Sequence, residues 1–286
     1  MKIGIVHFGS FSNGATQIVT SLMEGIQKYS YRLYALEWNQ NDTEIEAREL
    51  HIDSIQETER SGNALIRSFP KEKWNNISDH PTLSLLDSII VLGEREQQEV
   101  TESQSVRTLH IPVSIFNDID GTHYTLGYDT ALNSIITDIE RIRDTASSML
   151  YHKVRVFNVQ IPGENNTPLL EDAALAVGAT LISDTSEQEI ETMKSIISEK
   201  EKNGETYVFF MMNQSIDIDF FKEPITTEFT VDWKEAVIDQ SQCVGPYPTA
   251  LDIILTKKII AEIFTWIENG ATTGRFVIQN NKVLFQ

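Results

Sequence analysis

The chain is poor in cysteine and has no long apolar run, and each shortage excludes a class of protein. It has 286 residues but one cysteine, Cys243, so an internal disulfide is excluded and a reducing compartment is expected. No apolar run approaches the length needed to span a bilayer, and residues 2–8 form a strand-like run rather than a signal peptide. We therefore expect a cytoplasmic protein with no membrane partner.

Basic residues are also scarce, with 23 Lys and Arg against 42 Asp and Glu, which gives a net charge of −19. Such a field repels nucleic acid and anionic membranes, so we expect no nucleic-acid partner. It also opposes phosphorylated ligands wherever cations are not clustered locally. The six histidines show no H-x-x-x-H spacing and there is no C-x-x-C, so no metal site is expected.

What is present is a regular alternation of strand-like and helix-like segments. Hydrophobic residues make up 41% and aromatic residues 9% of the chain, as in an ordinary folded domain. Strands are predicted at 2–8, 32–37, 88–93, 109–115, 153–161, 180–183, 206–212, 275–278 and 282–285. Helices are predicted from about 15, from 130, and at 169–177, 187–202 and 249–269. This order predicts an α/β fold, with ligands in the loops after Phe8, Leu92 and Ile115.

Three local signals are specific. Asp129 or Thr130 is the expected N-cap of one helix, and Gly270 is the expected stop of another. The latter helix has an apolar face made of Leu251, Leu255, Ile259, Ile263 and Trp266. Asn280 and Asn281 are expected to form the turn of a closing hairpin.

One segment is far more informative than the rest. Residues 111–133 are IPVSIFNDIDGTHYTLGYDTALN, and RIRDTA follows at 141–146. The segment resembles the pattern P-x-T-I-D-N-D-I-x-G-T-D-x-T-I-G-x-D-T-A-L-N of the bacterial ATP-dependent 6-phosphofructokinases. The resemblance implies two lobes, each a largely parallel sheet sandwiched by helices: residues 1–127 with about 249–286, and residues 128–248. It also implies phosphoryl transfer from ATP to fructose 6-phosphate with magnesium.

The strongest departure from that pattern is Phe116. It stands where the family has the first aspartate of T-I-D-N-D, the base for the sugar hydroxyl, and a phenyl ring cannot accept a proton. Ser114 matches the threonine in chemistry, Asn117 is kept, and Asp118 matches the second, metal-associated aspartate. The resemblance therefore supports the fold more strongly than the activity.

The family's glycine-rich phosphate loops are altered as well. In the first loop, residues 9–16, Phe11 replaces an aspartate of G-G-D-x-P-G-M-N. In the second, G-G-D-G-S has become Gly93-Glu-Arg-Glu-Gln, so Arg95 stands at the metal carboxylate. Glu94 and Glu96 stand at glycine positions, and two like charges in such a site repel by roughly 4 kcal/mol at intermediate dielectric.

Two further family arginines are missing and one is kept. Glu164 replaces the arginine of M-G-R, and Cys243 replaces that of Q-R-G-G-x-P. Arg155 matches another arginine that contacts the sugar phosphate, although an exposed arginine on a strand is an equal interpretation. With Ser114, Asn117 and Asp118, Arg155 is our candidate for a remaining sugar-phosphate or anion site.

Three functions follow as hypotheses. The first is a catalytically inactive phosphofructokinase-like protein without cofactor, acting as a binding or regulatory subunit. The second is an active 6-phosphofructokinase with rearranged residues, using ATP and Mg²⁺. The third is a different chemistry built in the old cleft from Cys243, Glu164, Asp118 and Glu96. We expect a homo-oligomer, dimer or tetramer, or a hetero-oligomer with an active phosphofructokinase subunit.

Overall fold

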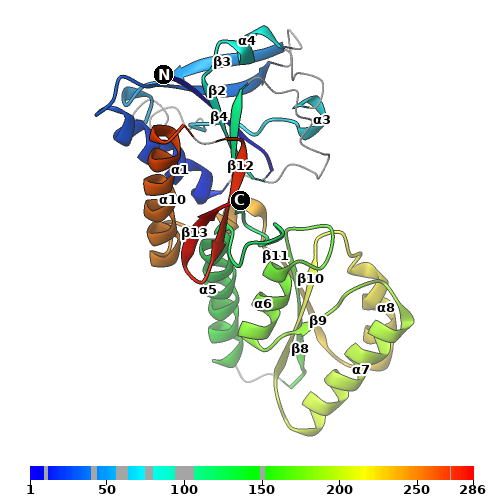
Figure 1. Ribbon diagram of the computed structural model, residues 1–286. Helices are drawn as coiled ribbons and strands as arrows, with labels where there is room; N and C mark the ends of the chain where they lie inside the picture. Colours follow the sequence, from blue (N-terminus) through cyan, green and yellow to red (C-terminus); the bar gives the residue numbers. More distant parts are fainter. Residues whose placement is uncertain are drawn as a thin grey trace. The chain divides into compact units, whose positions relative to one another are not determined.

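The computed structural model describes residues 1–9, 12–39, 44–55, 64–74, 80–93, 106–148, 152–270 and 272–286. The chain forms two compact units (Figure 1). Unit 1 contains Met1–Thr130 and Pro246–Gln286, and unit 2 contains Ala131–Gly245. These divisions lie three residues from those expected at 127 and 248. No helix in the described parts of the chain is long and apolar enough to cross a membrane.

Unit 1 is built on a seven-stranded sheet of order β13-β12-β5-β4-β1-β2-β3. Its strands are β1 (Lys2–His7), β2 (Arg32–Asn39), β3 (Glu44–Leu50), β4 (Ser88–Leu92), β5 (Arg107–Ile111), β12 (Gly274–Gln279) and β13 (Lys282–Phe285). All neighbours are parallel except the two edge strands, β3 and β13, which pair antiparallel. The hairpin prediction is confirmed, since Asn280 and Asn281 connect β12 and β13 with φ of 50° and 59°. β3 was not predicted, because its charged outer positions hide the apolar alternation.

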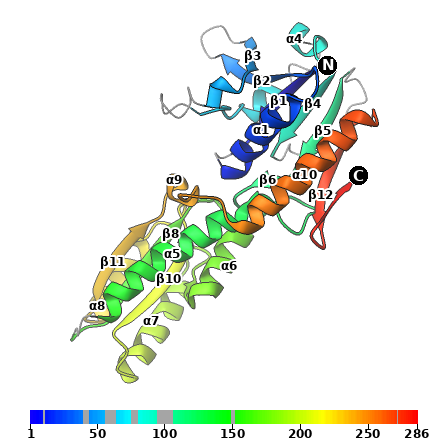
Figure 2. The ribbon, with the colours of Figure 1, turned by 90° about the vertical axis from the view of Figure 1, so that its left-hand side faces the viewer.

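Helices cover both faces of this sheet. Unit 1 contains α1 (Asn13–Ile26), α3 (Lys71–Trp74), α4 (Pro81–Ser84) and α10 (Ala250–Glu268), with the short strands β6 (Val113–Ser114) and β7 (Leu126–Gly127). α1 and α10 lie side by side and bury their apolar faces against one side of the sheet (Figures 1 and 2). On the other side Phe8, Phe69 and Trp74 pack edge to face, with ring centroids 5.4–6.1 Å apart.

The predicted limits of α10 are confirmed and those of α5 are not. The Thr249 side chain caps α10 by accepting from the Asp252 N–H, and Gly270 follows the helix with φ of 61°. α5 (Tyr128–Ser147) begins before Thr130, so neither Asp129 nor Thr130 is its N-cap. The reason is Asp252, whose carboxylate accepts from the N–H groups of Gly127 and Thr130 and from the Thr130 hydroxyl. A carboxylate from a distant helix therefore serves the start of α5.

Unit 2 contains a four-stranded parallel sheet of order β11-β8-β10-β9. Its elements are β8 (Arg155–Ile161), α6 (Pro168–Val177), β9 (Thr180–Leu181), α7 (Glu187–Lys202), β10 (Tyr207–Asn213), α8 (Asp219–Glu228), β11 (Asp232–Val237) and α9 (Gln240–Cys243), with the rest of α5. α7 and α8 cover one face with a shared apolar core, while residues of α5 contact the other. The sequence missed α8, which contains Pro224, and β11, whose edge position leaves its charged side chains in solvent.

Candidate functional site

The carboxyl ends of β1, β4 and β5 in unit 1 are tied together through the backbone. The Phe8 N–H donates to the Leu92 carbonyl at 2.8 Å, and the Gly93 N–H donates to the Ile111 carbonyl at 3.1 Å. Gly93 has φ of 98°, and a Cβ there would lie 2.4 Å from the Phe8 carbonyl oxygen, so only glycine fits. Gly93 is therefore required by its close contact with the end of the neighbouring strand.

The structure describes only parts of the two loops that resemble the family's phosphate loops. Phe11, Glu94, Arg95 and Glu96 lie outside the described residues. What was inferred for them from the sequence remains a prediction.

The loop between β6 and β7 carries the segment that resembles the kinase motif, and Asn117 organises it. Asn117 has a positive φ of 57°, and its side-chain oxygen accepts from the Thr125 N–H at 2.8 Å. Its amide nitrogen donates to the His123 carbonyl at 3.2 Å, and the Thr125 hydroxyl donates to the Ser114 carbonyl at 2.7 Å. Asn117 thus holds the backbone of the loop in its bent form.

Ser114, Phe116 and Asp118 lie together at the start of this loop. The Ser114 hydroxyl donates to Asp118 Oδ1 at 2.6 Å and accepts from the Phe116 N–H at 3.1 Å. Phe116 is half-buried, whereas Asp118 is exposed. The structure therefore brings together three of the residues singled out from the sequence, and it gives Ser114 an acidic neighbour rather than a basic one.

His7 is a residue that sequence analysis did not single out. It ends β1, is 1% exposed, and its Nε2 has no hydrogen-bond partner among the described residues. Burial lowers the pKa of His7 to about 4, so the imidazole is neutral at physiological pH. A lone histidine at the end of an apolar strand gives no spacing pattern by which the sequence could have identified it.

Arg155 belongs to unit 2 and begins β8. It is 4% exposed, so the interpretation as an exposed strand arginine is wrong. Its guanidinium donates to the Ala146 carbonyl at the end of α5. Because β8 has seven residues and rises about 3.3 Å for each, Arg155 lies roughly 20 Å from the loop after that strand.

Around Arg155 the structure shows a basic pocket of ≈ 390 Å³. Its lining residues are Arg141, Ile142, Thr145, Ala146, Arg155, Phe157 and Lys234. Arg141 pairs with Asp138 at 2.7 Å and Lys234 pairs with Asp232 at 3.1 Å, but neither carboxylate lines the pocket. Three cations therefore gather in an otherwise acidic chain. Their spacing of 14 and 79 residues explains why the sequence alone did not assemble them.

At the opposite end of the unit 2 sheet, where the strands have their carboxyl ends, neutral side chains connect the loops by hydrogen bonds. The Gln160 amide donates to the Ile216 carbonyl at 2.7 Å, and the Gln214 amide donates to the Ile238 carbonyl at 3.2 Å. The Ser215 hydroxyl donates to the Glu164 carbonyl at 3.0 Å, which fixes the loop after β8. Glu164, for which the resemblance implies an arginine in the family, is exposed at these carboxyl ends. The polar side chains at these carboxyl ends thus hold the loops to one another.

Cys243, the last residue of α9, is a free, buried thiol, 1% exposed. Burial, with Asp239 and Asp138 nearby, raises its pKa to about 12. The thiol stays protonated at neutral pH and is a poor nucleophile. Within the described ranges no group of three His, Cys, Asp or Glu side chains comes close enough to hold a metal ion.

Comparison with known proteins gives a consistent result. The model of the phosphofructokinase family ("Phosphofructokinase") matches residues 2–267. An ATP-dependent 6-phosphofructokinase of Staphylococcus epidermidis is 26% identical over 301 residues, covering 99% of this chain and 90% of that protein. One from Staphylococcus carnosus is 27% identical over 300 residues with the same coverage. Two solved phosphofructokinases have the same fold with a TM-score of 0.73: that of Saccharomyces cerevisiae, 19% identical, and a pyrophosphate-dependent one from Marinobacter aquaeolei, 13% identical. Each covers the whole of this chain, which spans 44% and 81% of those chains, respectively.

Proposed function

Since the chain belongs to the phosphofructokinase family, we propose that it is a family member that does not transfer phosphoryl groups and acts as a binding or regulatory subunit. The observation that carries this proposal is the loop after β6. Phe116 occupies the position of the family's base, and its neighbours Ser114 and Asp118 are hydrogen-bonded to each other. A placed base and developing-charge stabilisers are what phosphoryl transfer requires.

The charges of unit 2 support the same proposal. The family resemblance places an arginine at the position of Glu164, and a carboxylate there repels a sugar phosphate. Positive charge gathers instead around Arg155, at the amino ends of the strands. In the family, arginines cross from one subunit to the next, so a subunit without its own base can still present an anion pocket to a partner.

The alternative is an active ATP-dependent 6-phosphofructokinase with rearranged residues, using Mg²⁺. The relatives named above carry that activity in their names, and Asn117 still orders the backbone of its loop through hydrogen bonds. A changed chemistry based on Cys243 is less favoured, because its pKa of about 12 leaves almost no thiolate.

A coupled assay with pure protein, ATP, Mg²⁺ and fructose 6-phosphate distinguishes these hypotheses. We expect turnover far below about 1 s⁻¹, the lower end for kinases. Phe116→Asp alone should not restore activity, because Arg95 would still oppose the metal; Phe116→Leu is the matched control. Turnover of about 1 s⁻¹ or faster by the wild-type protein would show that the proposal is wrong.

ATP binding is a separate test. Glu94 and Glu96 at the family's glycine positions should prevent close approach of the phosphates, so calorimetry with ATP and Mg²⁺ should give no heat of binding at micromolar concentrations. Glu94→Gly and Glu96→Gly should each improve binding if those residues are the obstacle. Micromolar affinity that neither substitution alters would contradict this explanation.

Assembly is the third part of the proposal. We expect a homo-oligomer, a dimer at least, or a mixed oligomer with an active phosphofructokinase subunit, because closed symmetric assemblies are the commonest way to use a retained subunit surface. Size exclusion with light scattering measures the mass directly. A mass near 32.5 kDa that does not change when the host's active enzyme is added would exclude both forms.

A further inference from the structure

The chain passes between its two units twice, and both passages begin at one buried cluster of hydrogen bonds in unit 1. The first segment of unit 1 ends at Thr130, and the second begins at Pro246. The Thr130 hydroxyl donates to the Asp252 carboxylate and accepts from the Thr249 N–H at 3.1 Å. Thr130 and Asp252 are 2% and 1% exposed, so water does not compete for these bonds. One hydroxyl therefore joins the outgoing and the returning segments of the chain.

Asp252 holds the backbone on both sides of the first passage. Its Oδ1 accepts from the Gly127 N–H at 3.1 Å, and its Oδ2 accepts from the Thr130 N–H at 3.0 Å. Burial raises the pKa of Asp252, and these hydrogen bonds oppose that rise. Gly127 belongs to β7, which follows the loop with Asn117. The same side chain thus fixes the end of that loop and the first turn of α5.

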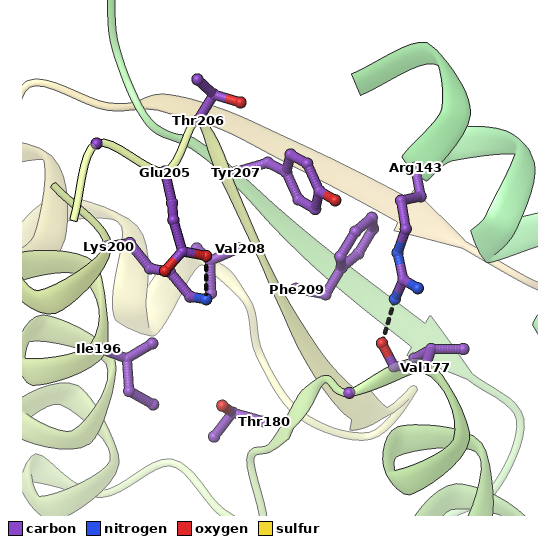
Figure 3. A pocket seen from close by; sticks show the side chains of 12 residues that line it. Arg143, Val177, Thr180, Ile196, Lys200, Glu205, Thr206, Tyr207, Val208 and Phe209 are labelled. Carbon is purple, nitrogen blue, oxygen red and sulfur yellow. Dashed lines mark hydrogen bonds and ion pairs between the residues drawn. The ribbon is translucent and has the colours of Figure 1, made fainter. Parts of the chain in front are cut away.

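The far end of α5 is fixed in unit 2 by other groups. The Arg143 guanidinium donates to the Val177 carbonyl and lies over the Phe209 ring, 5.5 Å from its centroid (Figure 3). The Arg155 guanidinium donates to the Ala146 carbonyl near the end of α5. The start of α5 is therefore held by unit 1, and its end is held by unit 2.

Arg143 also lines a second pocket, of ≈ 600 Å³, at the amino ends of the unit 2 strands (Figure 3). Both cations of this pocket are already paired. Arg143 pairs with Glu140 at 2.8 Å, and Lys200 pairs with Glu205 at 2.5 Å. The contacts of Arg143 thus serve to hold α5 within unit 2.

A helix of 20 residues is a stiff element, and α5 is shared by both units. We propose that Thr130, Thr249 and Asp252 form a latch that couples the two units, so that neither opens without the other. With the latch intact, opening of unit 1 withdraws the support of α5, and the loss of α5 uncovers one face of the unit 2 sheet. Without the latch, each unit opens according to its own stability.

Native-state hydrogen exchange on the full-length protein, read by mass spectrometry, measures the opening of each unit separately. Peptides from β1 and β4 report on unit 1, and peptides from β8 and β10 report on unit 2. In the wild-type protein we expect the slowest amides of both units to form one rate class. Thr130→Val removes the hydroxyl at nearly constant volume and should separate the two units by about tenfold or more in rate. Asp252→Asn, which replaces one acceptor oxygen by a donor, should have the same effect.

Thr256→Val is the matched control, because it also removes a buried hydroxyl. The Thr256 hydroxyl donates to the Asp252 carbonyl and to Gln17 Oε1, and these bonds involve neither Thr130 nor Thr249. Thr256→Val should therefore speed exchange but leave both units in one rate class, and Thr130→Ser, which keeps the hydroxyl, should behave as the wild-type protein does. The proposal is overturned if the wild-type units already exchange as separate classes. It is also overturned if Thr130→Val leaves them in one class, or if Thr256→Val separates them equally.

Discussion

In the unit 2 sheet, the carboxyl ends and the amino ends of the strands carry different kinds of side chain. At the carboxyl ends, the side-chain amides of Gln160 and Gln214 and the hydroxyl of Ser215 connect the loops that follow three strands. At the amino ends, five cations line two pockets, and each of them contacts a carbonyl or a carboxylate. In α/β sheets ligands usually bind at the carboxyl ends of strands. In unit 2, the carboxyl ends, where a ligand is expected, are occupied by hydrogen bonds between loops. The cations gather at the amino ends instead.

This difference teaches that retained backbone and retained chemistry are separate properties. The carboxyl ends in unit 1 follow the same principle, since Asn117 and Gly93 hold the shape of their loops, whereas Phe116 stands where the family resemblance implies a base. We therefore expect substitutions at the carboxyl ends of the strands to change the free energy of unfolding. Substitutions of the basic residues at the amino ends of the unit 2 strands should change ligand binding.

The largest expected effect concerns His7 at the carboxyl end of β1. The folded pKa of about 4 lies below the unfolded value of 6.5, so the unfolded state binds more protons between these values. Stability from His7 is complete above pH 6.5 and is lost as the pH falls to 4, by about 3 kcal/mol in total. Urea unfolding at several pH values measures it. His7→Leu is the control; an equally steep decline in that variant would show that His7 is not the cause.

The next effect is that of Asn117→Ala. The substitution removes two hydrogen bonds within the loop and places alanine at a positive φ, so unfolding free energy should fall by about 2–3 kcal/mol. Asn117→Gly removes the same bonds without the backbone strain and should cost less. Denaturant melts of the two variants separate the contributions, and equal losses would mean that the φ angle is unimportant.

A smaller effect on stability is expected at the carboxyl ends of the unit 2 strands. Gln160→Ala leaves the Ile216 carbonyl without that donor and should destabilise the protein by about 1 kcal/mol. Anion binding should be unaffected, because this residue lies at the opposite end of the sheet from Arg155. A change in phosphate affinity in this variant would show that the carboxyl ends and the amino ends of the sheet do not have separate roles.

The smallest effect on stability, with the clearest effect on binding, is expected for Lys234→Ala. Lys234 forms a half-exposed ion pair with Asp232, so stability should change by less than about 0.5 kcal/mol. Phosphate or sulfate binding at the basic pocket should weaken several-fold, and the dependence on salt should become shallower. The exposed Lys282 lines neither of the described pockets, so Lys282→Ala is the control; equal weakening in both variants would indicate a general charge effect.

The sequence predicted the fold better than the site, and particular residues show why. Periodicity located α10 and its caps, and the two asparagines located the closing hairpin, because these signals are local. It placed the start of α5 wrongly, because the carboxylate that serves this start comes from Asp252, 122 residues away. The basic pocket was missed for the same reason: Arg141, Arg155 and Lys234 meet only after β8 and β11 pair. The burial of Arg155 and His7 depends on packing that no short pattern encodes.

The link between Asp252 and Thr130 also has a consequence for the order in which the protein is made. Unit 2 is one continuous stretch, whereas unit 1 needs residues from both ends of the chain. On the ribosome, the first 130 residues emerge without α10, one of the two helices that cover one side of their sheet, and without the carboxylate that serves the start of α5. Unit 2 can therefore fold first, and the apolar face on which α10 packs stays open to chaperones until α10 has left the ribosome.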